Sequence, residues 1–114
     1  TGTGIPHALP ALALRPARAF PAVPIILCHA GWSVFADEAI VAAEAAENLY
    51  LEPSWCGPYQ IAAMIGSLGA ERVLYGSDHL NNIASELAKF TSLGLSEGDL
   101  ALCLGGNAKR LFNL

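Results

Sequence analysis

The sequence predicts an α/β fold in which parallel β-strands alternate with α-helices. Three short apolar stretches have the composition of buried strands, and a helical stretch separates each one from the next: residues 24–28, 48–52 and 72–76. Strands that alternate with helices are typical of βαβ units, whose strands are parallel. With 114 residues, the chain is expected to form one domain at most.

The first twenty residues predict short helical pieces. Residues 5–20 are rich in Ala and Leu, but Pro6, Pro10 and Pro16 interrupt them. Proline inside a helix removes a hydrogen bond and clashes with the preceding turn. We therefore expect several short helices, with Pro16 as the first helical residue of the last one.

Helices are also predicted after each of the first two strands. Residues 35–47 are Ala-rich, and acidic residues near their start suit the N-terminal helix dipole. Pro58 can begin a helix that runs to Leu68, and Gly69 can end it. Three nearly continuous apolar strands should be covered on both faces of their sheet.

The last third of the chain predicts three further helices. The first covers residues 83–92, after either of two asparagines that could cap it. Residues 96–99 resemble a capping box with Asp in the Glu position, which would start a helix to Leu104. The pair Gly105–Gly106 is expected to break that helix, and Asn107 to cap a final one through Phe112.

Composition and charge exclude several classes of protein. The chain is 54% hydrophobic and 14% charged, against an average charged fraction of about 25%. We expect no membrane span, because no apolar run approaches about 18 residues. The net charge of −4 without a basic cluster argues against nucleic acid as a partner. Three dispersed cysteines and no signal-peptide pattern indicate reduced thiols in a cytoplasmic protein.

The ends of two predicted strands carry ionisable groups. His29 directly follows the first strand, and Asp78 follows the third through Gly76 and Ser77. A glycine there lets another group approach the backbone closely. The carboxyl ends of parallel strands share one edge of a sheet, which is where α/β folds usually place their chemistry. We therefore expect His29 and Asp78 to form a catalytic pair, in either a small open sheet or an arc of an eight-stranded barrel.

Four stretches, in this order, resemble the amidohydrolase-related family of metal-dependent hydrolases and decarboxylases, which are TIM barrels: residues 24–32, 48–54, 69–78 and 107–112. The resemblance covers nearly the whole chain, which corresponds to about the last third of such a barrel. It implies that the three strands are strands six to eight, and that the chain is a single partial domain, the C-terminal segment of the barrel. Residues 1–4 then resemble the loop after strand five. In the family that strand ends in a metal-binding His, which would directly precede Thr1.

The resemblance also implies roles for the two strand-end residues. His29 matches the strand-six His that acts on substrate or water. Asp78 matches the strand-eight Asp that binds the metal or holds its water, and that commonly shuttles a proton. The implied cofactor is a divalent metal, zinc or alternatively manganese. The sequence departs from the family after Asp78, because His79–Leu80 replaces a common aromatic and proline, which leaves the substrate subclass open. A catalytic zinc needs three protein ligands, and this chain offers no obvious third.

Each candidate also has a purely structural interpretation. Asp78 could cap the following turn, and His29 could be a hydrogen-bonded loop histidine. Trp32 and Trp55 follow strands on the predicted active face, where they could form a substrate wall or pack under a loop.

For the remaining polar candidates the structural interpretation is the safer one. His79 is expected on the solvent side of its loop, and His7 is expected to have no catalytic role. Glu52 and Ser54 could meet substrate, although capping is the safer interpretation, and the three cysteines are expected to pack.

Three hypotheses follow. The first is the C-terminal part of a metal-dependent hydrolase or decarboxylase for a small organic substrate, carboxylated or aromatic. The second is a catalytically inactive barrel fragment that self-associates or pairs with the missing N-terminal part, because bare strand edges favour pairing. The third is a small flavodoxin-like domain, which would need an acidic cluster at its strand ends where only Asp78 is firmly placed.

Overall fold

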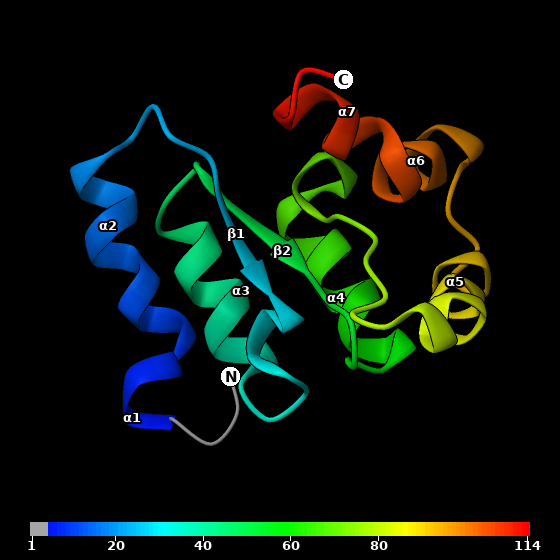
Figure 1. Ribbon diagram of the computed structural model, residues 1–114, viewed down its shortest axis with the longest axis horizontal. Coiled ribbons are helices and arrows are strands. Elements are labelled where there is room, and N and C mark those ends of the chain that lie inside the picture. Colours follow the sequence, from blue (N-terminus) through cyan, green and yellow to red (C-terminus); the bar gives the residue numbers. More distant parts are fainter. Residues whose placement is uncertain (1–4) are drawn as a thin grey trace.

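The computed structural model describes residues 5–114, which form an α/β fold around two parallel strands. Strand β1 (Ile25–Cys28) pairs with β2 (Leu49–Glu52), so that Ile25 lies opposite Leu49 and Cys28 opposite Glu52. The two strands lie side by side in Figure 1 and end at the same edge. The parallel sheet predicted from the sequence is therefore present in these two strands. The expectation for residues 1–4 lies outside the described residues.

The chain enters the sheet through short helical pieces, as predicted. They are α1 (Ile5–Ala8), a 3-10 turn at Pro10–Ala13 and α2 (Leu14–Ala19). The prolines explain the fragmentation, because each removes a main-chain donor. Pro16 is the third residue of α2 and not its first, so the predicted start of this helix is two residues late.

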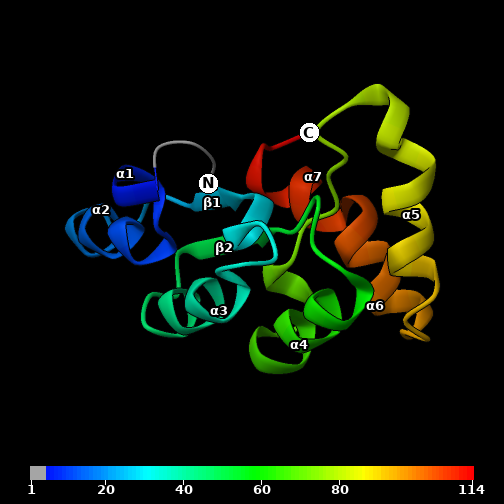
Figure 2. The same ribbon diagram turned by 90° about the horizontal axis from the view of Figure 1, so that it is seen from below.

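Helices α3 (Ala36–Glu44) and α4 (Pro58–Leu68) lie together on one side of the sheet. Figure 2 shows both helices below the strands. The side chains of Leu49 and Leu51 on β2 are fully buried in the core. The side chains of the opposite face are half-buried or exposed: Ile26, Cys28, Tyr50 and Glu52. The expectation that helices cover both faces is therefore wrong for the described chain.

The third predicted strand, residues 72–76, is reduced to one β-bridge. Val73 pairs with Leu51 in parallel, and the Leu74 N–H donates to the Leu51 carbonyl at 2.8 Å. The following N–H, that of Tyr75, does not bond to β2 and instead donates to the Cys103 carbonyl at 2.8 Å. The segment lies in the predicted place, parallel to β2, but one bridge does not make a regular strand. A 3-10 turn at Ala70–Arg72 precedes it.

Three further helices complete the chain: α5 (Ile83–Thr91), α6 (Glu97–Ala101) and α7 (Asn107–Leu111). Ser96 caps α6, with its Oγ accepting the Asp99 N–H at 3.1 Å as the capping box predicts. The predicted break at Gly105–Gly106 is wrong, because a π-helical turn at Leu102–Gly106 carries the chain straight into α7. No helix of residues 5–114 is long and apolar enough to cross a membrane.

Candidate active site

One pocket at the carboxyl end of the strands is lined by four residues that the sequence singles out. Its volume is about 270 Å³, and it is lined by His29, Trp32, Trp55 and Asp78. His29 and Trp32 follow β1, Trp55 follows β2, and Asp78 follows the bridged segment. The rule that parallel strands end at one edge thus correctly places these side chains together.

All four pocket residues have left-handed backbone conformations. Their φ angles are 63° at His29, 48° at Trp32, 71° at Trp55 and 59° at Asp78. For residues with a Cβ this region costs about 1–2 kcal/mol each, and such strain gathers at functional sites. The sequence gives no sign of it, because none of these positions is a glycine.

Asp78 is held by the side chains on either side of it. The Trp55 Nε1–H donates to Asp78 Oδ2 at 2.9 Å, and His79 Nε2 lies 3.2 Å from the same oxygen. His29 Nε2 lies 3.9 Å from Asp78 Oδ1, which is too far for a hydrogen bond. His79 is on the solvent side, with 70% of its side chain exposed, but it contacts Asp78 as well. The carboxylate of Asp78 therefore lies between two imidazoles.

His29 is anchored on its other side by a polar network that the sequence interpretation missed. Its Nδ1 lies 2.8 Å from Ser54 Oγ, and its main-chain N–H donates to Glu52 Oε2 at 3.2 Å. Glu52 accepts both the Ser54 N–H, at 2.8 Å, and the Ser54 hydroxyl, at 3.0 Å. Capping therefore describes only part of what Glu52 does. The alternation of side chains along a strand, which puts residues 52 and 54 on one side, is the signal that could have found it.

The two tryptophans are accessible to a molecule in the pocket. Trp32 is 50% exposed and Trp55 is 42% exposed, so neither is simply packed under its loop. Trp55 is also fixed from behind, because its main-chain N–H donates to Glu86 Oε1 at 3.2 Å. Glu86 is buried and pairs with Lys89 Nζ at 2.7 Å, and Lys89 in turn donates to the Cys56 carbonyl. Sequence reasoning did not identify Glu86 or Lys89, which lie about thirty residues beyond the loop that they fix.

The thiols are not activated. Cys28 is exposed, but partial desolvation of its thiol raises its pKa, and the carboxylates of Glu52 and Asp78 raise it further. Burial also raises the pKa of the Cys56 thiol, and it raises the pKa of Cys103 to about 11. Only the thiolate is a good nucleophile or metal ligand, so the raised pKa values make all three cysteines less reactive than an ordinary thiol near neutral pH.

The residues of this chain do not fit a complete metal site. Within residues 5–114, no group of three or more His, Cys, Asp or Glu side chains is placed to hold a metal ion. A catalytic zinc requires three protein ligands and an open position. Asp78 and the histidines beside it therefore supply a part of such a site at most.

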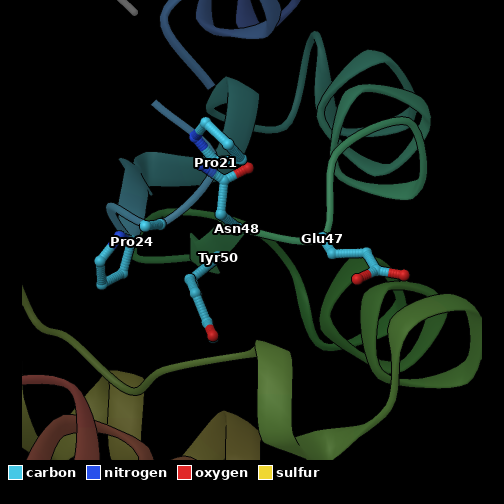
Figure 3. A pocket seen from close by; sticks show the side chains of 6 residues that line it. Pro21, Pro24, Glu47, Asn48 and Tyr50 are labelled. Carbon is cyan, nitrogen blue, oxygen red and sulfur yellow. The ribbon is translucent and has the colours of Figure 1, made fainter. Parts of the chain in front are cut away.

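Other hollows do not include Asp78 or the two tryptophans. His7 lines a mainly apolar pocket of about 280 Å³ that also reaches Cys28 and Gly31. A pocket of about 220 Å³ at the amino end of the strands is shown in Figure 3. There Pro21 and Pro24 lie to one side of Asn48, while the carboxylate of Glu47 points away from them. This pocket carries no histidine or aspartate, so we do not associate it with the chemistry.

Comparisons with known proteins identify what the chain is similar to. A family model described as amidohydrolase matches residues 3–114. A sequence comparison with curated proteins finds no match. Among solved structures, an uncharacterized TIM-barrel protein from Bordetella bronchiseptica is similar with a TM-score of 0.82 and 25% identity. That match covers 98% of this chain and 42% of the other.

A second similar structure is 5-carboxyvanillate decarboxylase from Sphingomonas paucimobilis. Its TM-score is 0.64 at 22% identity, and the match covers 95% of this chain and 38% of the other. At this identity the likeness concerns the fold. The chain therefore spans about two fifths of the length of both solved structures.

Proposed function

The chain belongs to the amidohydrolase family, and on that premise we propose that it is the C-terminal part of a metal-dependent hydrolase or decarboxylase. The observation that carries the proposal is the pocket in which His29, Trp32, Trp55 and Asp78 meet. Perturbed backbone and convergent polar groups in one hollow are the usual features of an active site.

We assign the chain to strands six to eight of a TIM barrel, as one partial domain. The parallel order of β1, β2 and the bridge at Val73 supports this assignment. In such a barrel the helices lie outside, and the inner faces of the strands meet in the middle. The half-exposed face that carries Tyr50 and Glu52 has the character of that inner face, and α3 and α4 lie on the outer side.

In this proposal the two strand-end residues divide the proton transfers. Asp78 acts as general base toward a water or substrate group in the pocket, and His29 acts as acid/base or stabilises developing negative charge. Their facing atoms, 3.9 Å apart, both border the pocket, so both can reach a group bound there. Asp78 also contributes one ligand to a divalent metal, zinc or alternatively manganese, whose other ligands come from outside the described residues. When bound, such a metal supplies Lewis-acid activation.

The substrate that we propose is a small organic molecule, carboxylated or aromatic. Two partly exposed indole rings offer flat apolar contacts, and a pocket of about 270 Å³ suits a small ligand. The pocket residues are compatible with hydrolysis and with decarboxylation, so both reactions should be assayed.

The proposal is tested by substituting Asp78→Asn in the protein that carries this chain, and assaying hydrolysis and decarboxylation of aromatic carboxylic acids with added Zn²⁺ or Mn²⁺. Removal of a general base should lower kcat by about 10²- to 10⁴-fold. His7→Gln is the matched control, because His7 lines a different pocket. Unchanged activity in Asp78→Asn, with His7→Gln also unchanged, would contradict the proposal.

A specific observation also favours the second hypothesis, an inactive fragment that self-associates. Large apolar side chains are strongly exposed, among them Val34, Tyr59 and Leu80. Strand β1 has a neighbouring strand only on its β2 side within the described chain, and a bare edge favours pairing with another chain. Light scattering of the 114-residue chain separates the two cases, because a monodisperse monomer contradicts self-association.

A further inference from the structure

We infer that Glu52 and Ser54 fix neutral His29 in the tautomer that carries its proton on Nδ1, so that the bare Nε2 faces Asp78 and the pocket. Glu52 and Ser54 do not line the pocket, so they are positioning residues and not catalytic ones. Their use in catalysis rests on the proposed function, whereas the tautomer itself does not.

The inference starts from the contact between Glu52 and the Ser54 hydroxyl. An ionised carboxylate can only accept hydrogen bonds, and a serine hydroxyl has a single proton to donate. Ser54 Oγ lies 3.0 Å from Glu52 Oε2, so the hydroxyl proton must point at the carboxylate. Toward any other group, Ser54 Oγ can then act only as a hydrogen-bond acceptor.

The same hydroxyl lies 2.8 Å from His29 Nδ1. A bare Nδ1 would set its lone pair against a lone pair of Ser54 Oγ, so the proton of this hydrogen bond must come from Nδ1. In a neutral imidazole one nitrogen is the donor and the other the acceptor. His29 Nε2 is therefore the acceptor, and it is the nitrogen that lies 3.9 Å from Asp78 Oδ1.

The carboxylate of Glu52 is held from three directions. It accepts the main-chain N–H groups of His29 and Ser54 as well as the hydroxyl, and Ser54 is only 1% exposed. A Cβ on Gly76 would overlap the Glu52 carboxylate, so glycine leaves room for the carboxylate in the position that it occupies here. The close approach that the sequence predicts at Gly76 is thus the approach of Glu52, and three strand ends together fix the imidazole.

This arrangement decides how His29 enters a reaction. With its proton held on Nδ1, neutral His29 can accept a proton from the pocket side but cannot donate one there. Once it has accepted that proton, the new N–H points toward the Asp78 carboxylate, which can stabilise the charge. Glu52 and Ser54 thereby select the base function of His29 for the first step.

The tautomer can be measured without any assay of activity. Long-range ¹H–¹⁵N correlation spectra of the 114-residue chain at about pH 8, where an ordinary imidazole is neutral, distinguish a protonated from a bare ring nitrogen. A His29→Gln variant identifies the His29 signals. We expect Nδ1 at the upfield, protonated position and Nε2 at the downfield, bare position.

Two substitutions then test whether Glu52 and Ser54 determine the tautomer of His29. In Glu52→Ala the Ser54 hydroxyl loses its carboxylate acceptor, so its proton is free to turn to Nδ1 and the two ¹⁵N positions should move toward each other or exchange. In Ser54→Ala the Nδ1 partner is lost, and both nitrogens should move to intermediate positions. Glu44→Ala, which removes an exposed carboxylate on α3, is the matched control and should leave the His29 signals in place.

Each outcome supports or overturns the inference. An Nε2-protonated His29 in the unsubstituted chain overturns it, and so does an Nδ1-protonated ring that persists unchanged in folded Glu52→Ala. Should Ser54→Ala fail to fold, the unsubstituted chain and Glu52→Ala still decide. A wrong proposed function would show in the Asp78→Asn assay and leave these spectra unaffected, so the two failures are distinguishable.

Discussion

The two ends of the strands use polar side chains in opposite ways. At the amino end, Asn48, Arg72 and Asn107 each direct their N–H groups at two or three main-chain carbonyls. At the carboxyl end, polar side chains such as His29, Ser54 and Glu52 bond mainly to one another. The first end binds the backbone of distant segments together, and the second end holds functional groups in place.

The amino-end contacts join segments that are far apart in the sequence. Asn48 Nδ2 donates to three carbonyls in α2 and in the turn that follows it, at distances of 2.9–3.1 Å, on Ala17, Phe20 and Val23. Arg72 joins the end of α3 to β2 through the carbonyls of Ala43, Ala46 and Leu49.

A carbonyl without a donor is costly when it is buried, and these three side chains supply donors to carbonyls that lie mostly at helix ends and in turns. At the carboxyl end the backbone is instead strained at all four pocket residues. The difference teaches that polar side chains at the amino end of the strands hold the chain together, whereas those at the carboxyl end hold one another in place around the pocket.

The largest effect that would test this contrast is expected for Asn107→Asp. Asn107 is fully buried, and its Nδ2 donates to the carbonyls of Ala70 and Val73 at 2.7 and 2.9 Å. The substitution keeps the shape but sets a carboxylate against two carbonyls, so the free energy of unfolding should fall by at least about 3 kcal/mol. Urea unfolding measures this. Asn113→Asp, at an exposed position, is the control, and a loss of less than about 1 kcal/mol in Asn107→Asp would break the comparison.

A smaller effect is expected at the carboxyl end for Trp55→Phe. The substitution keeps an aromatic ring but removes the N–H that donates to Asp78 Oδ2. Because Trp55 is partly exposed, the free energy of unfolding should fall by about 1 kcal/mol or less. Trp32→Phe serves as the control for loss of indole area. A destabilisation by Trp55→Phe as large as that by Asn107→Asp would show that the pocket end also carries the fold.

The smallest effect concerns thiol reactivity at the two ends. Cys28 is exposed near the pocket, whereas Cys103 is buried at the amino end with its Sγ 3.6 Å from the Ala70 carbonyl. A disulfide reagent near neutral pH should modify Cys28 slowly, because its pKa is raised, and should leave Cys103 unmodified until the chain unfolds. Counting modified thiols with and without urea measures this, and equal rates at the two residues would contradict the comparison.

The raised pKa of Cys103 also sets the sign of a pH effect. Its value of about 11 in the folded chain lies above that of an unfolded thiol, so the unfolded chain loses this proton first. The associated stability is complete below the unfolded pKa and is lost as pH rises toward about 11.

Features that depend on local pattern could be predicted from the sequence. Helix α4 has the predicted bounds because Pro58 and Gly69 mark its ends. The placing of His29 and Asp78 in one pocket followed from strand polarity alone. Their chemical roles remain predictions.

Features that depend on contacts between distant segments could not be predicted. Asn107 looked like a helix cap, but its side chain donates to carbonyls more than thirty residues away. The third predicted strand is only one β-bridge long, because the Tyr75 N–H donates to the Cys103 carbonyl and not to β2. In the Glu52–Ser54–His29 network, strand alternation could have placed Glu52 and Ser54 on one side, but it could not have placed them against His29 of the neighbouring strand.

The left-handed backbone at the pocket has a consequence for anyone who would redesign its specificity. In a library that varies His29, Trp32, Trp55 and Asp78, a substituted residue must first be able to adopt the left-handed backbone conformation. Only variants that can do so would fold and reveal the chemical effect of the new side chain. Glycine, asparagine and aspartate enter the left-handed region readily, whereas valine and isoleucine rarely do. Variants recovered from such a library would report first on which side chains the loops tolerate, and a change of substrate is better sought at neighbouring positions with ordinary backbone angles.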